Sequence, residues 1–147
     1  MNNLKIVFSD FDGTLTFKES LLPIFFEILN FLKYKKIPLV IVTGRSLSWG
    51  HFLLTHFPDL ETVIAEGGGV IIKKTSHNFL EDCLVSEKNL LKLNLATQKL
   101  LNQFKGIELS KDSFGRKTDR AIELFDLKDL NLLNANFKYR NSSMAMG

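Results

Sequence analysis

The first half of the chain alternates short apolar runs with a segment of helical periodicity. Residues 4–8, 39–42 and 62–65 are continuous apolar runs with the length and composition of buried β-strands. Between the first two, residues 20–34 place apolar side chains three and four positions apart, as in an amphipathic helix. Strand, helix and strand within about 40 residues predict two parallel neighbouring strands joined by a right-handed crossover.

Local signals mark the ends of this helix. Ser20 can cap its amino end, and Pro23 falls in the first turn, where its missing N–H costs little. Lysines near the carboxyl end suit the helix dipole, and Pro38 ends the helix. A second helix is expected over residues 46–57, directly after the second strand.

The pattern changes from residue 73 onward. A helix is expected over residues 87–104, followed by strands, a short helix and a weak strand at 107–110, 121–125, 127–134 and 137–140. A helix followed by meandering strands predicts an α+β insertion rather than continued strand-helix-strand winding.

Two carboxylates follow the first strand. Asp10 and Asp12 come directly after the apolar run, and Gly13 and Thr14 break it. In open α/β sheets, ligands bind outside the carboxyl ends of the strands. Two residues apart in an extended segment, these side chains leave on the same side. A divalent cation or a phosphate could therefore meet both carboxylates, or one carboxylate and a backbone carbonyl.

The residues from Asp10 to Thr14 allow two other interpretations, a solvated turn and a calcium-binding loop. Most Asp-Gly pairs are solvated turns, and this interpretation stays open. A calcium-binding loop needs a third oxygen ligand at position 14 and a bidentate Glu at position 21, where this chain has Thr14 and Leu21. The spacing therefore rejects the calcium loop.

A second polar turn follows the second strand. Thr43, Gly44 and Arg45 stand between that strand and a predicted helix. A hydroxyl, a backbone N–H at Gly44 and the positive end of a helix together suit a phosphate oxygen. Glycine in such a turn usually reflects backbone geometry alone, so the functional interpretation depends on the neighbouring Asp10 turn.

These turns resemble the motifs of a known superfamily. The run Asp-Phe-Asp-Gly-Thr-Leu-Thr at 10–16 resembles the first motif of the haloacid dehalogenase superfamily, most of whose members are magnesium-dependent phosphatases. Val-Thr-Gly-Arg at 42–45 looks like the second motif, in the form typical of the branch with sugar-phosphate phosphatases. Glu-Gly-Gly at 66–68 resembles that branch's Glu-Asn-Gly turn, with Gly67 in place of Asn. Three consecutive glycines by themselves predict a tight hairpin.

The resemblance implies a magnesium-dependent phosphomonoester hydrolase that acts on a sugar phosphate or a similar small metabolite. Asp10 would be the nucleophile, and Asp12 would be the general acid and base. Thr43, Gly44 and Arg45 would bind the phosphate, and Asp10 and Asp12 would hold Mg²⁺.

The resemblance also implies an α/β fold: a Rossmann-like parallel sheet with a partial α+β cap inserted after the third strand. We place the core at residues 1–76 and the partial cap at residues 77–147. The charged run at 116–120 would lie on this cap, where we expect a solvated hairpin rather than a substrate contact.

Two further motifs of the superfamily, a lysine and an acidic Gly-Asp-type motif, are missing from the sequence. Lys117, Asp126 and Asp129 are the available substitutes, but no glycine precedes Asp126. We therefore expect an incomplete fragment of an enzyme that stops inside its cap. The alternative is a non-catalytic binding or regulatory module that retains half of the site.

Composition narrows the remaining possibilities. The net charge of +3 comes without a dense basic block, so we expect no nucleic-acid partner and a small phosphorylated metabolite as ligand. Cys83 is the only cysteine and cannot form an internal disulfide. No apolar run is long enough to span a bilayer and no signal-peptide pattern opens the chain, so we expect a cytoplasmic protein. An incomplete sheet edge would favour a homodimer.

Overall fold

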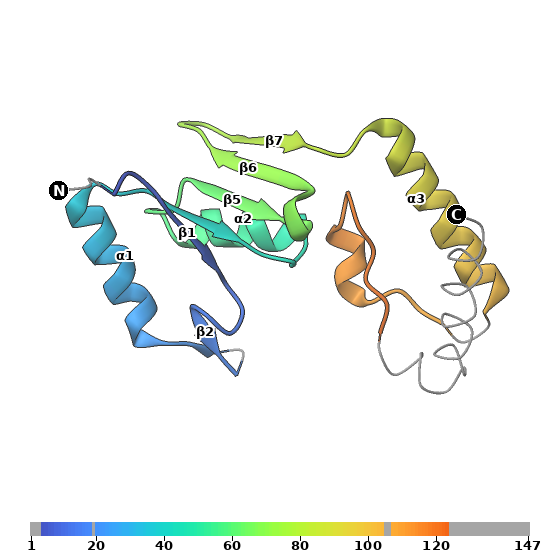
Figure 1. Ribbon diagram of the computed structural model, residues 1–147, viewed down its shortest axis with the longest axis horizontal. Helices are drawn as coiled ribbons and strands as arrows, with labels where there is room; N and C mark the ends of the chain where they lie inside the picture. The colour runs from blue at the N-terminus through green and yellow to red at the C-terminus, as the bar shows by residue number, and fades with distance from the viewer. Residues whose placement is uncertain (1–3, 19, 105–106, 124–147) are drawn as a thin grey trace, which may run out of the picture.

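A mixed β-sheet forms the centre of the computed structural model, which describes residues 4–18, 20–104 and 107–123 (Figure 1). Within these residues the sheet has five strands, in the spatial order β1 (Val7–Asp10), β4 (Leu39–Val42), β5 (Thr62–Ala65), β6 (Val70–Lys74) and β7 (Phe79–Cys83). Strands β1, β4 and β5 are parallel, whereas β6 and β7 are antiparallel to their neighbours. The predicted α/β fold with a parallel core is confirmed, and two hairpin strands extend its sheet.

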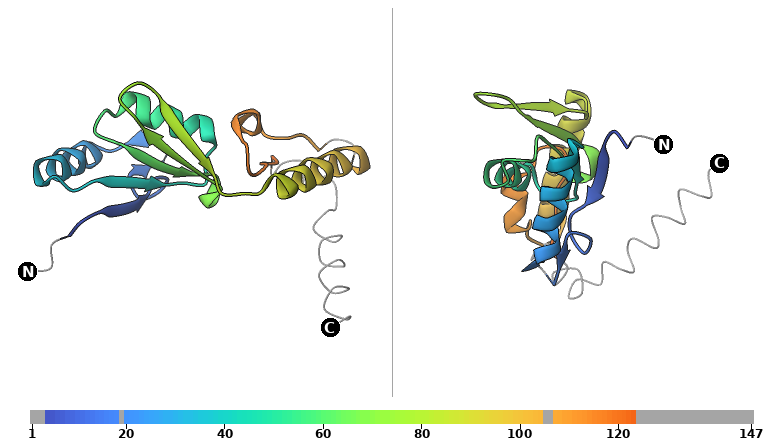
Figure 2. Two further views of the ribbon diagram at one scale, coloured as in Figure 1. Left: turned by 90° about the horizontal axis from the view of Figure 1, so that it is seen from above. Right: turned by 90° about the vertical axis from the view of Figure 1, so that its left-hand side faces the viewer.

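Two helices cover one face of the sheet. Helix α1 (Pro23–Lys35) connects β1 to β4, and α2 (Leu47–His56) connects β4 to β5, so both crossovers place their helix on the same side (Figure 2). The Phe25 side chain of α1 is fully buried, and its ring meets Phe57 edge-on with centroids 5.1 Å apart. The main hydrophobic core therefore lies between these helices and the sheet.

The first helix begins three residues later than the sequence suggested. Leu22 occupies the N-cap position without a side-chain cap, and Pro23 is the first helical residue. The predicted cap, Ser20, belongs instead to strand β3 (Ser20–Leu21), which pairs with β2 (Thr16–Phe17). The prediction for Ser20 was wrong because a small hairpin after the Asp10 turn uses this residue in backbone pairing.

Close packing fixes α2 against the sheet. The Ser46 hydroxyl caps the helix by accepting the Trp49 N–H at 3.4 Å. A Cβ added at Gly50 would overlap the end of the Ile72 side chain on β6. Glycine therefore allows the helix to approach the sheet at this point.

The second half of the described chain extends beyond the sheet. Helix α3 (Glu87–Gln103) matches the predicted helix, and the short helix η2 (Lys111–Gly115) lies between α3 and the sheet (Figure 1). The two predicted strands that follow α3 are reduced to a single bridge between Leu109 and Ile122. The later predictions, for 127–134, 137–140 and the acids Asp126 and Asp129, lie outside the described residues.

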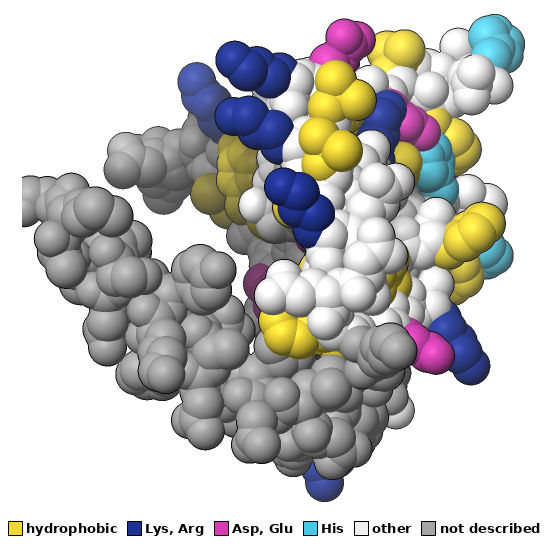
Figure 3. All heavy atoms as spheres, turned by 90° about the vertical axis from the view of Figure 1, so that its right-hand side faces the viewer, with side chains coloured by type: hydrophobic (Ala, Val, Ile, Leu, Met, Phe, Trp, Pro, Cys, Tyr) yellow, Lys and Arg dark blue, Asp and Glu magenta, His cyan; other side chains and the backbone are white. Residues whose placement is uncertain are grey.

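Helix α3 buries none of its described side chains. Leu91 and Leu95 are more than half exposed, and hydrophobic, Lys and Arg side chains are interspersed on this side of the molecule (Figure 3). No helix among the described residues is both long and apolar enough to cross a membrane.

Strand β7 belongs to the same sheet and ends at Cys83, beyond residue 76, the predicted end of the core.

Candidate functional site

Two strand ends bring the polar turns together. In the parallel pair of β1 and β4, Asp10 is in register with Val42, the residue before Thr43. Both strands end at the same edge, which faces the η2 segment (Figure 1). The turn after β1 and the turn after β4 are therefore neighbours.

The Asp10 turn alternates exposed acids with a buried aromatic residue. Phe11 is only 3% exposed and packs edge-on against Phe25 in the core, whereas Asp10 and Asp12 are exposed. The Thr14 hydroxyl lies 3.3 Å from one oxygen of Asp10. Gly13 adopts φ 79°, a left-handed conformation that favours glycine. Burial of Phe11 thus leaves both carboxylates outside the core.

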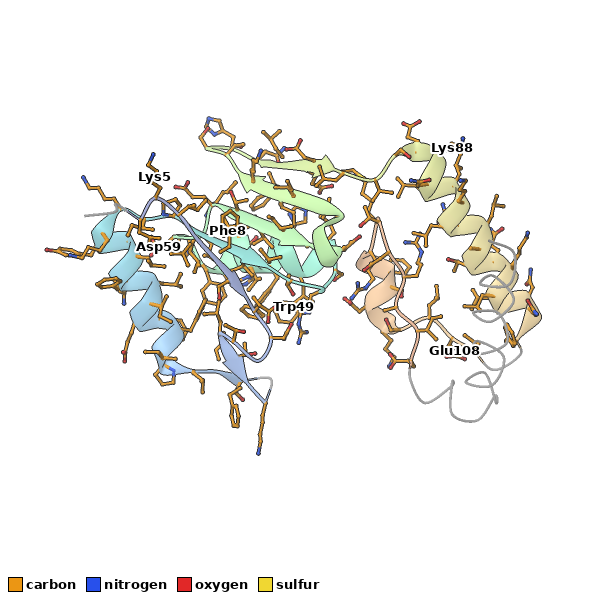
Figure 4. All side chains as sticks on the ribbon, in the orientation of Figure 1. Lys5, Phe8, Trp49, Asp59, Lys88 and Glu108 are labelled. Carbon is orange, nitrogen blue, oxygen red and sulfur yellow. The ribbon has the colours of Figure 1, made fainter. Side chains whose placement is uncertain are left out.

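Arg45 joins the two turns through Asp12. Its Nε lies 2.8 Å and 3.0 Å from the two carboxylate oxygens of Asp12, and its Nη2 lies 2.7 Å from one of them. The guanidinium also lies over the Trp49 ring, 4.4 Å from the ring centroid. Trp49 itself lies near the end of β1 (Figure 4). Arg45 is thus held between a carboxylate and an aromatic face.

Thr43 is 2% exposed, and its backbone and side chain are both hydrogen-bonded. Its N–H donates to Ile64 O, and its carbonyl accepts the Gly67 N–H. Its hydroxyl oxygen accepts the Arg45 N–H at 3.1 Å. These hydrogen bonds hold the turn in one conformation. The Thr43 hydroxyl hydrogen is the group that would donate a hydrogen bond to a phosphate.

The turn after β5, which resembles a turn of the phosphatase branch, supplies a buried carboxylate that was not among the predicted site residues. Glu66 is 5% exposed and begins η1 (Glu66–Gly68), in which Glu66, Gly67 and Gly68 all have positive φ. The Glu66 side chain accepts N–H groups of Leu47 and Lys117, and both the N–H and the hydroxyl of Thr118. The sequence signals for this position were the resemblance of Glu-Gly-Gly to the Glu-Asn-Gly turn and its place directly after a buried strand.

Opposing effects set the pKa of Glu66. Burial by itself raises the pKa, because it disfavours the charged form. The hydrogen bonds from the Thr118 hydroxyl and N–H, then from the N–H groups of Lys117 and Leu47, outweigh this effect. The pKa of Glu66 is therefore below its ordinary value, and the carboxylate is ionised.

The charged run at 116–120 also folds onto this edge. Arg116 Nη1 donates to Gly44 O at 3.0 Å, and its guanidinium contacts the carboxylates of Asp112 and Asp119 at 2.9 Å. The Arg116 side chain is only 10% exposed. The expected solvated hairpin is therefore wrong for Arg116, because three oxygen acceptors enclose its guanidinium.

Lys117 was a candidate for the missing lysine of the superfamily. Its ammonium has the Glu81 carboxylate on β7 as partner, at 3.6 Å. The same carboxylate lies 2.8 Å from His51 Nε2. The structure thus gives the Lys117 side chain a partner on the sheet, while its backbone N–H binds Glu66.

A cavity of about 430 Å³ lies beside Asp12 and Arg45. Its walls include the aromatic side chains of Trp49, Phe52 and Phe57. Cavities of this volume bind small molecules. The cavity places an apolar aromatic surface next to the carboxylate and the guanidinium.

The residues at this edge fit a magnesium ion only in part. No cluster of three or more His, Cys, Asp or Glu that could hold a metal occurs among residues 4–18, 20–104 and 107–123. Mg²⁺ is usually held by one or two carboxylates, with water and substrate phosphate as further ligands. Asp10 and the backbone carbonyl of Asp12 would supply two protein oxygens to such a site, whereas Arg45 engages the Asp12 side chain.

Comparison with solved structures supports the fold. A protein from Thermoplasma acidophilum is similar with a TM-score of 0.60 at 16% identity, over 86% of this chain and 55% of that chain. A protein from Geobacillus kaustophilus gives 0.51 at 22% identity, over 69% and 38% of the two chains. A haloacid dehalogenase-like hydrolase from Bacillus subtilis gives 0.50 at 20% identity, over 65% and 34%. At these identities the similarity concerns the fold alone.

The chain spans about half or less of the length of these three structures. No curated protein sequence matches it. The family model for haloacid dehalogenase-like hydrolases matches residues 7–139, which is most of the chain. With both polar turns at the carboxyl edge of a parallel sheet, this match shows that the chain belongs to the haloacid dehalogenase-like hydrolase family.

Proposed function

We propose that the chain carries the phosphate-binding and nucleophilic half of a phosphomonoesterase that acts on a sugar phosphate or a similar small metabolite. The observation that carries this proposal is the contact between Arg45 and Asp12. It joins the turn that bears two carboxylates to the turn that offers Thr43 and Gly44. A phosphate ester between them would meet a nucleophile, a proton donor and a cation.

The reaction has two steps. Asp10 attacks phosphorus, an aspartyl-phosphate forms, and the bond to the ester oxygen breaks while Asp12 donates a proton to that oxygen. Asp12, now a carboxylate, takes a proton from water, and the resulting hydroxide displaces Asp10 to release inorganic phosphate. The bidentate contact with Arg45 corresponds to this carboxylate form.

Magnesium would be held by the Asp10 carboxylate and the Asp12 carbonyl. When bound, it neutralises negative charge on the phosphoryl oxygens. The protein itself supplies position: the Thr43 hydroxyl and the Arg45 guanidinium lie in the turn beside the Asp10 turn and orient the phosphate.

The aromatic cavity supports a sugar or a sugar-like leaving group. It adjoins Asp12, which would protonate the leaving oxygen. Sugars have an apolar C–H face that packs against aromatic rings, and Phe52 and Trp49 offer such rings here. The leaving alcohol would thus occupy the cavity while the phosphate lies at the two turns.

A second candidate is a binding or regulatory module without turnover. The observation that favours it is the placement of Lys117, whose ammonium pairs with Glu81. A module of this kind would bind phosphate at the same turns and release the ester unchanged.

One experiment separates the two candidates. Hydrolysis of glucose 6-phosphate and of a generic aryl phosphate is measured with Mg²⁺, for the chain and for Asp10→Asn. An enzyme loses several orders of magnitude of rate in this variant, since the nucleophile is gone. Hydrolysis by the chain that Asp10→Asn leaves intact contradicts the covalent mechanism. Phosphate binding without any hydrolysis favours the module.

A further inference from the structure

The candidate phosphate-binding turn is held by a segment far away in the sequence. Arg116 lies 72 residues after Gly44, yet its Nη1 donates to the Gly44 carbonyl at 3.0 Å. The segment reaches this place after α3, and it closes on itself through the bridge between Leu109 and Ile122. Figure 1 shows it between α3 and the carboxyl edge of the sheet.

The contact at Gly44 controls the orientation of one peptide unit. The Gly44 carbonyl and the Arg45 N–H belong to the same planar peptide group. Arg116 holds the carbonyl end, and the N–H end donates to the Thr43 hydroxyl oxygen at 3.1 Å. Rotation of this peptide would break both hydrogen bonds. Arg116 therefore fixes the hydroxyl proposed to meet the phosphate.

Two carboxylates in turn hold Arg116. Asp112 and Asp119 contact its guanidinium at 2.9 Å, and the side chain is 10% exposed. Burial lowers the pKa of Arg116, but Asp119 and Asp112 outweigh this effect and raise the pKa above its ordinary value. The guanidinium is therefore charged, and its planar fork serves three acceptors at once.

Glu66 holds the same turn from the other side. Its backbone N–H donates to Arg45 O at 2.9 Å, and its carboxylate accepts the Leu47 N–H at 2.9 Å. The same carboxylate accepts the Thr118 hydroxyl at 2.6 Å and the Lys117 N–H at 2.9 Å. One buried side chain thus links the start of α2 to the segment after α3.

Glycines allow the two surfaces to meet without a gap. A Cβ at Gly69 would overlap the Thr118 side chain, and a Cβ at Gly115 would overlap Ser48. Gly69 itself has φ −72°, so an alanine there brings no backbone strain. Substitution of Gly69 would therefore displace Thr118 and require only a small adjustment at Glu66 O, which would lie 3.3 Å from the added Cβ.

We propose that Arg116 and Glu66 are positioning residues that lock the Thr43–Gly44–Arg45 turn in its phosphate-receiving conformation. We call this pair of contacts the clamp. It makes phosphate affinity at the core depend on the segment that follows α3. The inference rests on the proposed function, because it assigns the clamp a role in phosphate binding at that turn.

The test measures binding of inorganic phosphate to the full 147-residue chain. Trp49 is the only tryptophan in the sequence and its ring contacts the Arg45 guanidinium, so its fluorescence reports on the turn. Calorimetry gives the dissociation constant independently. The variants are Arg116→Gln, Glu66→Gln and Gly69→Ala, with circular dichroism to check folding. Asp82→Asn and Lys33→Gln are matched controls, since each removes one exposed ion pair outside the clamp.

Misplacement of a group at a site by about 1 Å can cost roughly 100-fold in reaction rate. Phosphate affinity should respond to the same misplacement of the turn, so we expect the clamp variants to bind phosphate about tenfold or more weakly. The controls should bind like the original chain. Arg116→Lys should recover only part of the loss, because an ammonium cannot serve three acceptors in one plane. A merely structural role would not produce this graded recovery in a folded protein.

The outcomes separate the two proposals. Unchanged phosphate affinity in folded Arg116→Gln and Gly69→Ala overturns the clamp and leaves the proposed function standing. If Glu66→Gln does not fold, the phosphate affinities of Arg116→Gln and Gly69→Ala still test the clamp. Absence of phosphate binding in the original chain overturns the proposed function, and the clamp's role with it.

Discussion

The Arg45 guanidinium holds both carboxylate oxygens of Asp12, with its Nε 2.8 Å and 3.0 Å from them. Asp12 stands after β1 and Arg45 after β4, 33 residues later. A phosphate that enters between the turns would be a second anion for the same guanidinium. The carboxylate and the phosphate therefore compete for Arg45, and this competition predicts opposite effects for the two partners.

Asp12→Asn should bind inorganic phosphate at least as tightly as the original chain, because an amide competes more weakly for Arg45. Turnover should be lost, since the general acid and base is gone. Phosphate titration followed by Trp49 fluorescence measures the first effect, and hydrolysis of glucose 6-phosphate measures the second. Weaker phosphate binding in this variant would refute the competition.

Arg45→Gln should weaken phosphate binding and lower kcat/KM by about 100-fold, the usual cost of one preorganised electrostatic partner. Arg45→Lys should not restore the original value, because lysine cannot make the bidentate contact. Lys33→Gln serves as control, since Lys33 pairs with Asp59 on the surface. Steady-state kinetics for all three variants check this, and equal values would exclude Arg45 from the phosphate site.

Magnesium should bind weakly alone and more tightly with phosphate present. Asp10 is the carboxylate left for the ion, as Arg45 engages the Asp12 side chain. Coupling between ligands is reciprocal, so magnesium should strengthen phosphate binding by the same factor. Calorimetric titration of Mg²⁺ with and without inorganic phosphate measures both. Equally tight Mg²⁺ binding by Asp10→Asn would place the ion elsewhere.

Glu66 should make the stability of the fold depend on acid pH. Its pKa in the folded chain is below the ordinary value of 4.5, so its stabilising effect is complete above that pH. The effect should disappear as the pH falls through the folded value. Hydrogen bonds to charged groups contribute about 1.5–3 kcal/mol each, so Glu66→Gln should unfold more easily at pH 7.

Urea unfolding at pH 7 and at pH 3 checks this prediction. The original chain should lose more stability between the two pH values than Glu66→Gln does. Asp82→Asn, which lacks only an exposed ion pair, should follow the original chain. Parallel pH curves for the original chain and Glu66→Gln would show that this carboxylate is not linked to folding.

Phe25→Ala should destabilise the core by about 3–5 kcal/mol, as expected for a buried aromatic residue. The Phe25 ring is fully buried and meets the rings of Phe11 and Phe57. Phe31 on the same helix is 58% exposed, so Phe31→Ala should change stability far less. Urea unfolding of both variants compares the two helix faces, and equal losses would contradict the observed orientation of α1.

The sequence by itself determined the order of the core elements. Continuous apolar runs predicted β4 and β5, and helical periodicity predicted α1, because burial imposes these patterns locally. Asp10, Asp12 and Thr43 were predicted from their places after these strands and from their resemblance to the superfamily's motifs, since short turns after parallel strands gather at one edge of the sheet.

The tertiary structure alone decided what these residues contact. Ser20 suited a helix cap, but strand pairing took it up. The charged run containing Arg116 had the composition of a solvated loop, yet three oxygen acceptors bury its guanidinium. No helical or strand periodicity in the sequence around Glu66 marked it as a partner of Thr118, 52 residues away. Contacts between distant segments depend on shape and hydrogen-bond geometry at the meeting surface, and local sequence patterns do not encode them.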